Sequence, residues 1–177
     1  MKKRLFFTGP IGCGKSTAIR AALAEKLPLC GGFLTCRHRE PHLYFTLESP
    51  DGSFVRTFLD FSAGKPAVEL SAFSEAFLRG KVLVLDEIGG VELLNPAFLS
   101  ALEQVLASDV PILGVWKGED PANKLVQTLG LTERYTRAAE RIRKRLQNDP
   151  DTELYPCGQF DENARMLAEK WVKEYLP

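Results

Sequence analysis

A nine-residue run near the N-terminus carries the clearest chemistry in this chain. It reads Gly-Pro-Ile-Gly-Cys-Gly-Lys-Ser-Thr and fills every fixed position of the pattern G-x-x-x-x-G-K-[ST]. Glycines let a loop turn its backbone N–H groups inward, and a following helix adds partial positive charge at its N-terminus. Lys15 would reach the β- and γ-phosphates of a nucleotide, and the Ser16 hydroxyl would bind Mg²⁺. The predicted nucleotide-binding residues are Gly9, Pro10, Ile11, Gly12, Cys13, Gly14, Lys15, Ser16 and Thr17.

Two adjacent acids provide the second half of the predicted site. Asp86 and Glu87 follow the apolar run 82–85, which is typical of a strand buried on both faces of a parallel sheet. Ligands of open α/β sheets bind at the carboxyl ends of the strands, so both acids are expected beside the phosphates. Asp86 is the candidate second ligand of Mg²⁺, directly or through a water. Glu87 is the candidate catalytic base that orients and deprotonates the attacking water.

Charge that develops during phosphoryl transfer calls for a cation in addition to Lys15. The candidates are Arg39, with its neighbour Arg37, and Arg56 in a β-prone segment. A further group, on one face of a late charged helix, would suit either a lid or a solvated surface balanced by glutamates; it comprises Arg134, Arg137 and Arg141. After the acid pair, Gly89-Gly90 fits a mobile segment and a tight turn equally well, and the role of Glu92 stays open.

Strands and helices alternate along the segments that must position these residues. Apolar runs predict strands at 5–8, 82–85, 111–116 and 154–157, and helical patterns cover 17–27, 68–78, 96–106 and 161–175. Between them, two β-prone runs at 43–47 and 54–59 flank a turn sequence and predict an inserted antiparallel hairpin. We therefore expect an α/β protein with a three-layer P-loop NTPase fold, a mainly parallel central sheet and this insertion.

Size and composition fit one globular domain spanning residues 1–177. Hydrophobic residues make up 45% of the chain and charged residues 26%, and 23 basic residues balance 23 acidic ones. This balance gives no reason to expect nucleic acid or an anionic membrane as a partner, and the sequence points to no protein partner. The 4 cysteines lack CxxC spacing. We interpret them as reduced thiols of a cytoplasmic protein.

Four stretches together resemble the family of small standalone P-loop nucleoside triphosphatases, of the cancer-related nucleoside triphosphatase type. They are 9–17, Gly-Phe-Leu-Thr at 32–35, Val-Leu-Asp-Glu-Ile-Gly at 84–89 with Glu-Leu at 92–93, and Asp-Glu-Asn-Ala-Arg at 161–165. The resemblance implies slow, Mg²⁺-dependent hydrolysis of several nucleoside triphosphates to diphosphates, with little base discrimination. It also implies that Asn163 and Arg165 lie near the nucleotide, although this stretch would equally suit the capped start of a surface helix.

The chain departs from the family pattern beside the acid pair. Where the family usually carries a basic residue and a methionine after Asp-Glu-Ile-Gly, this sequence has Gly90-Val91. If that basic residue acts at the γ-phosphate, this protein needs a cation from another position.

Two other functions remain compatible with these motifs. One is a kinase for a small molecule or nucleotide, because an arginine-rich segment could close over the site and exclude water. The other is a nucleotide-gated binding module, in which Gly89-Gly90 and the inserted hairpin act as switch elements. The leading hypothesis is hydrolysis, because Glu87 beside Asp86 provides a base for water.

Overall fold

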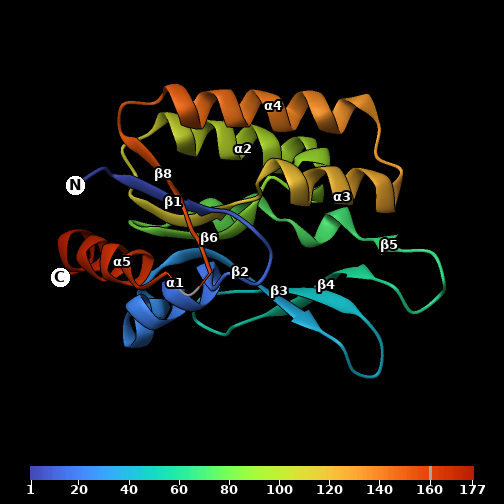
Figure 1. Cartoon of the computed structure of the whole chain (residues 1–177), viewed down its shortest axis with the longest axis horizontal. Coiled ribbons are helices and arrows are strands. Elements are labelled where there is room, and N and C mark those ends of the chain that lie inside the picture. The colour runs from blue at the N-terminus through green and yellow to red at the C-terminus, as the bar shows by residue number, and fades with distance from the viewer. Residues whose placement is uncertain (160) are drawn as a thin grey trace.

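The computed structural model describes residues 1–159 and 161–177, and within them eight strands form one mixed sheet (Figure 1). The strand order is β5-β4-β3-β2-β6-β7-β1-β8. Strands β2, β6, β7, β1 and β8 run parallel, whereas β2 to β5 pair antiparallel in sequence. The α/β class, the mainly parallel core and the antiparallel insertion are therefore confirmed. The strand bounds are β1 Arg4–Thr8, β2 Gly31–His38, β3 Tyr44–Glu48, β4 Val55–Asp60, β5 Ala67–Val68, β6 Leu83–Ile88, β7 Ile112–Trp116 and β8 Thr152–Pro156.

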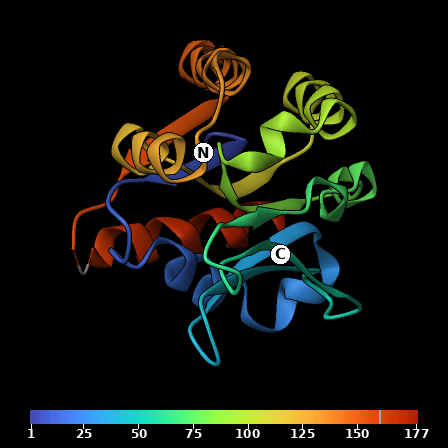
Figure 2. The same cartoon turned by 90° about the vertical axis from the view of Figure 1, so that its right-hand side faces the viewer.

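Helices cover both faces of the sheet and complete three layers. Figures 1 and 2 show α2, α3 and α4 on one side of the sheet and α1 and α5 on the other. Among the described residues, no helix combines the length and the apolar character that crossing a bilayer requires. The bounds are α1 Lys15–Leu23, α2 Pro96–Ala107, α3 Glu119–Leu129, α4 Glu133–Asn148 and α5 Glu162–Tyr175, with 3₁₀ turns η1 Ala24–Leu29, η2 Leu70–Ala72, η3 Glu75–Leu78 and η4 Val91–Leu94.

The central strands read as continuous apolar runs because both of their faces are covered. In β1, Phe6 packs into the cluster under α2 and α4, whereas its neighbours Leu5 and Phe7 pack against α1 and α5. Strand β6 alternates in the same way, with Leu85 on the first side and Val84 on the second. This period of two places both sets of side chains in apolar surroundings and holds the carboxyl ends of the strands at one edge.

The helix predicted over 68–78 is wrong. The segment instead forms β5 and two short 3₁₀ turns separated by the extended Phe73. Its polar residues favour turns, since Glu69 accepts a hydrogen bond from the Ser71 N–H and Ser74 accepts one from the Ala76 N–H. Between the turns, the buried Phe73 ring packs against three other phenylalanines, Phe33, Phe58 and Phe98. Tertiary packing of one aromatic residue therefore overrides a helical pattern.

Candidate active site

The glycine-rich run forms a loop between β1 and α1. Gly9, Gly12 and Gly14 all have positive φ, at 136°, 81° and 97°, a region that side chains rarely adopt. A Cβ atom on Gly9 would also lie only 2.5 Å from the carbonyl oxygen of Cys157. The Lys15 ammonium donates to the carbonyl oxygens of Gly9 at 3.0 Å and Pro10 at 2.6 Å. The loop thus curls around the ammonium group of its own lysine.

A cavity of about 550 Å³ opens beside this loop. Of the predicted binding residues, Gly9, Ile11, Gly12 and 14–17 line it, while Pro10 is exposed and Cys13 is buried in the core under α1. The other walls come from the ends of β2, β6 and β7, from α3 and from the antiparallel insertion. We call this insertion, formed by β3 to β5 and the loops before each of them, the antiparallel extension. The volume lies within the range of ordinary small-molecule sites.

Asp86 is fully buried and contacts Ser16, one of the residues that line the cavity. One of its carboxylate oxygens accepts a hydrogen bond from the Ser16 hydroxyl at 2.6 Å, and the other accepts one from the Thr35 backbone N–H at 3.3 Å. Burial raises the pKa of Asp86 to about 6, against the opposing effect of the Ser16 hydrogen bond. The structure therefore brings together the two predicted Mg²⁺ ligands, Ser16 and Asp86, although 70 positions separate them in sequence.

Glu87 forms an ion pair that sequence reasoning missed. The Lys117 ammonium donates to a carboxylate oxygen of Glu87 at 2.5 Å. Lys117 directly follows β7, and β7 lies between β1 and β6, the strands that carry the phosphate loop and the acid pair. The sequence does show a lysine immediately after a buried apolar run. It does not show that this lysine lies beside Glu87, because that depends on the order of the strands in the sheet. Glu87 itself has a φ of 72°, so its backbone holds a strained conformation of the kind found at active sites.

The Gly89-Gly90 segment forms a tight turn fixed by buried side chains. The Glu92 carboxylate accepts hydrogen bonds from the Gly89 N–H at 2.6 Å and the Gly90 N–H at 2.9 Å. From α4, the Tyr135 hydroxyl donates to the Gly89 carbonyl at 2.7 Å. Burial raises the pKa of Glu92 to about 7, although the two backbone N–H groups favour its ionised form. Glu92 is thus a buried anchor of the turn rather than a solvent-facing acid.

The arginines predicted as transition-state cations lie away from this centre. Arg39 and Arg56 are exposed, and the Arg56 guanidinium lies 6.0 Å from the centre of the Phe54 ring. Both are outside the set of described residues that line the cavity, whereas Arg37 and Lys117 belong to it. Arg39 directly follows β2 and Arg56 belongs to β4, and both side chains are exposed to solvent, so neither contributes its charge to the cavity wall.

The two remaining groups of candidates lie on helix surfaces. Asn163 is exposed, and Arg165 pairs with Glu169 at 2.9 Å one turn along α5. Asp161 caps that helix by accepting from the Ala164 N–H, as the capped-helix alternative expects. On α4, Arg137 pairs with Glu133 at 2.6 Å, and Arg141 pairs with Glu103 at 2.7 Å. Such ion pairs are typical of solvated, charge-balanced surfaces. They agree with the interpretation of the α4 arginines as a surface balanced by glutamates and not as a lid.

Comparisons with known proteins agree with this site and fold. The family model described as NTPase matches residues 61–149. The "Nucleoside-triphosphatase THEP1" of Thermotoga maritima is 31% identical over 134 residues, which cover 67% of this chain and 76% of that protein. The "Cancer-related nucleoside-triphosphatase homolog" of Mus musculus is 29% identical over 136 residues, covering 61% and 71%.

Two solved structures share the fold over nearly the whole chain. The crystal structure of THEP1 from Aquifex aeolicus has a TM-score of 0.67 at 19% identity and covers 98% of this chain and 99% of that one. The solution structure of a human cancer-related nucleoside triphosphatase has a TM-score of 0.60 at 24% identity, with coverages of 98% and 97%. The predicted three-layer P-loop fold is confirmed by these likenesses. The matched family model and the Thermotoga relative together place this chain in the NTPase family, as the resemblance had predicted.

Proposed function

We propose that this protein hydrolyses nucleoside 5'-triphosphates to diphosphate and phosphate, with Mg²⁺ and with little selectivity for the base. The observation that carries the proposal is that Ser16 and Glu87 both line the cavity beside the phosphate loop, while the buried Asp86 contacts Ser16 directly. Relatives named as nucleoside triphosphatases support the reaction class. Low base selectivity follows from a binding motif made of phosphate-directed backbone groups.

The oxygens of Ser16 and Asp86 fit a small, hard divalent cation. Mg²⁺ favours oxygen ligands and few protein groups, and it takes its other ligands from phosphates and water. Within the described part of the chain, no group of three or more His, Cys, Asp or Glu residues forms a self-sufficient metal site, which suits a metal that arrives with its nucleotide. When bound, Mg²⁺ would neutralise charge on the β- and γ-phosphates. It would also offset the burial of the Asp86 carboxylate.

Glu87 and Lys117 provide the remaining chemistry in this proposal. Glu87 is two-thirds buried, with 33% of its side chain exposed, and it lines the cavity, so it can hold a water and accept its proton. Lys117 lies at the strand end between the loop and the acid pair, where its charge can act on the γ-phosphate. Lys117 thus supplies the positive charge that relatives with a basic residue after Asp-Glu-Ile-Gly would supply from the position of Gly90. The strained backbone of Glu87, held by the Gly89-Gly90 turn, keeps the base in place.

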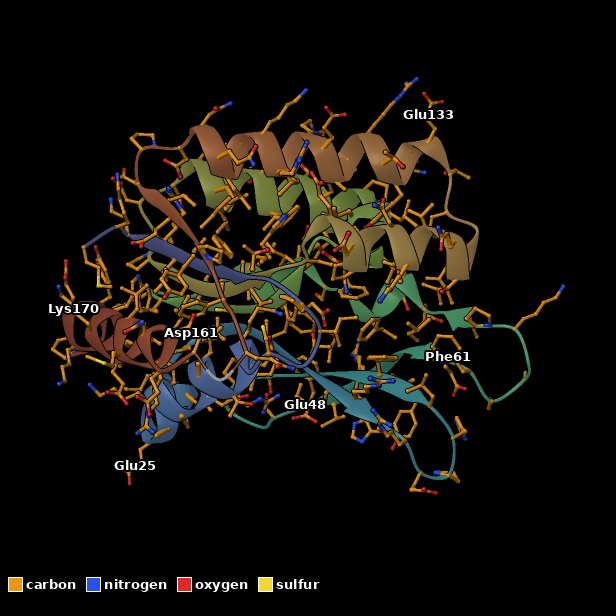
Figure 3. All side chains as sticks on the ribbon, viewed as in Figure 1. Glu25, Glu48, Phe61, Glu133, Asp161 and Lys170 are labelled. Atoms are coloured by element: carbon orange, nitrogen blue, oxygen red, sulfur yellow. The ribbon has the colours of Figure 1, made fainter. Side chains whose placement is uncertain are left out.

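The test is phosphate release from ATP, GTP, CTP and UTP with Mg²⁺. Glu87→Gln should lower turnover by roughly 10²- to 10⁴-fold while nucleotide binding is retained, because it removes a general base and leaves the loop intact. The matched control is Glu25→Gln, the same chemical change on an exposed residue of η1 remote from the site (Figure 3). Unchanged turnover in Glu87→Gln would refute the role of Glu87. Release from only one of the four nucleotides would refute the low base selectivity.

We further propose that the protein acts in the cytoplasm on free nucleotides, with neither membrane nor nucleic acid required. The four cysteines Cys13, Cys30, Cys36 and Cys157 are free thiols, which suits a reducing compartment. The balance of acidic and basic residues supports the absence of a polyanionic partner.

A further inference from the structure

The cavity extends beyond the catalytic groups into an apolar part. The apolar lining residues are Leu43, Phe45, Phe58 and Phe61 from the antiparallel extension, Phe73 from the segment between η2 and η3, and Leu125 of α3. We call this part the apolar chamber. Phe61 lies just past the end of β4, on the extension (Figure 3). Glu87 and Lys117 line the same cavity as the chamber.

Neither a triphosphate nor water accounts for such walls. Phosphates are strongly hydrated anions, and their partners here are backbone N–H groups, Lys15 and a metal ion. An attacking water needs a base and a polar pocket of its own size. Aromatic and aliphatic walls instead favour the apolar body of a small molecule, which gains free energy roughly in proportion to the area removed from water.

The strand order separates this chamber from the expected place of the base. The chamber is built on β3 and β4, beyond β2 and β6, whereas the phosphate loop follows β1. The Ser16–Asp86 contact marks the metal and γ-phosphate end of the nucleotide, and Glu87, the next residue, lines the same cavity as the chamber walls. A triphosphate with its γ-phosphate at Glu87 therefore directs its base away from the chamber, toward the β8 side of β1.

We propose that the apolar chamber binds a small uncharged alcohol with an aromatic or aliphatic body, and that this alcohol accepts the γ-phosphoryl group in place of water. The inference rests on the proposed function, since it uses the same nucleotide site and the same base. The alcohol oxygen forms a bond to the γ-phosphorus, and the bond from that phosphorus to the β,γ-bridging oxygen breaks. The hydroxyl proton passes to the Glu87 carboxylate, and the diphosphate leaves with the electron pair.

The uncharged class follows from the composition of the walls. A charged group buried among Phe45, Phe58 and Phe73 would lose its hydration without a partner. Of the cations that line the cavity, Lys117 pairs with Glu87. The exposed Arg37 holds its guanidinium 5.8 Å from the centre of the Phe45 ring, so neither of these cations is buried inside the chamber as a partner for a charged ligand. A hydroxyl is the smallest group that can present both a nucleophile and a proton to Glu87.

The experiment supplies phenylalkanols of increasing length, from benzyl alcohol to 3-phenylpropanol, to the protein with ATP and Mg²⁺. ADP and inorganic phosphate are quantified in parallel, and phosphorylated alcohol is measured by mass spectrometry. Hydrolysis gives ADP and phosphate in equal amounts, whereas transfer lowers phosphate relative to ADP. We expect a phosphate-to-ADP ratio below one that falls with alcohol concentration and saturates, with tighter binding for longer alcohols.

Two variants test the chamber, and one serves as a control. Phe61→Ala removes part of one wall and should raise the half-saturating alcohol concentration roughly tenfold. Thr128→Trp adds an indole on α3, at an exposed position that lines the cavity, and should abolish transfer. Val55→Ser, on the exposed part of β4, should leave alcohol transfer as in the wild type. Circular dichroism and melting temperature establish that all three fold.

Each result decides the proposal. A ratio of one at every alcohol concentration overturns it, whether or not the alcohols bind. Adenosine that displaces bound phenylpropanol from the wild type, together with loss of adenosine binding in Thr128→Trp, also overturns it, because the chamber would then hold the base. ADP formed only with alcohol supports the acceptor and refutes hydrolysis, and equal ADP and phosphate without any effect of alcohol does the reverse.

Discussion

The phosphate loop and the acidic corner lie side by side in one cavity, yet they are built by different means. In the loop, positive φ angles at Gly9, Gly12 and Gly14 shape the backbone, and Lys15 bonds to carbonyls within a few residues. In the second region, side chains from β6, η4, α4 and the end of β7 contact one another although they are far apart in sequence. We call this region the acidic corner; it comprises Asp86, Glu87, Gly89, Gly90, Glu92, Lys117 and Tyr135.

This difference in construction determines how each region stabilises charge. The loop presents backbone groups to a ligand and leaves Ser16 and Lys15 partly accessible. The corner buries two carboxylates, Asp86 and Glu92, whose pKa values burial raises to about 6 and about 7. Buried acids are costly unless donors compensate for the lost hydration. Changes in the loop should therefore act on binding and turnover, and changes in the corner should act on stability as well.

The largest effect is expected in the loop. Lys15→Ala should lower turnover by roughly 10³-fold and weaken triphosphate binding, because it removes the cation that contacts the phosphates. Phosphate release and equilibrium binding of ATP measure the two quantities. Lys170→Ala, on the surface of α5, serves as the matched control (Figure 3). A Lys15→Ala protein that binds ATP like the wild type and turns over normally would contradict the assignment of the loop.

The second prediction asks whether Lys117 belongs to the chemistry or only restrains Glu87. We expect Lys117→Ala to lower kcat by roughly 10²-fold with a smaller change in KM, because its charge acts mainly in the transition state. Lys117→Arg should recover part of the rate, since it keeps the charge but not the geometry. Faster turnover in Lys117→Ala would show instead that the ion pair holds the base in an inactive position.

These two kinds of construction explain which parts of the site can be predicted from the sequence. The loop could be predicted residue by residue, because each glycine acts on its own backbone and the pattern is contiguous. Asp86 and Glu87 could be located because a buried strand must end at the ligand-binding edge. The partnership of Glu87 with Lys117 could not, because it depends on β7 lying between β1 and β6, an order that no local pattern specifies.

The same reasoning explains the wrong helix prediction and the position of Arg39 and Arg56 outside the cavity lining. Segment 68–78 has helical spacing, but the packing of Phe73 against other phenylalanines decides its structure. Arg39 and Arg56 lie on the correct part of the chain, yet their direction relative to the cavity depends on the twist and pairing of the extension. Element types follow from sequence more readily than the faces to which side chains point.

The third prediction concerns the stability of the acidic corner as a function of pH. Burial raises the pKa of Glu92 to about 7 from an ordinary 4.5, so between these values the folded protein binds more protons than the unfolded chain. Its free energy of unfolding should therefore fall as pH rises through this window. Relative to Glu92→Gln, which cannot titrate, the wild type should lose roughly 3 kcal/mol between pH 4.5 and 8.

Urea unfolding of both proteins across this pH range measures the difference. Groups other than Glu92 are present in both proteins, so their titration cancels in the comparison. The charge of the nearby Lys117 favours the ionised Glu92 carboxylate in the wild type. A stability difference that is flat with pH, or that rises with it, would show that Glu92 is already ionised at low cost in the folded state.

The smallest effect is expected from the hydroxyl that closes the corner from α4. Tyr135→Phe removes the donor to the Gly89 carbonyl and leaves that carbonyl unpaired beside a buried ring, so it should cost about 1 kcal/mol of stability. Tyr175→Phe, which loses an exposed hydrogen bond to the Met1 carbonyl, should cost clearly less. Because Tyr135 and Glu92 hold opposite sides of one turn, their substitutions should not add independently. Strict additivity in the double variant would mean that the turn is fixed by its glycines alone, and the acidic corner would then resemble the phosphate loop after all.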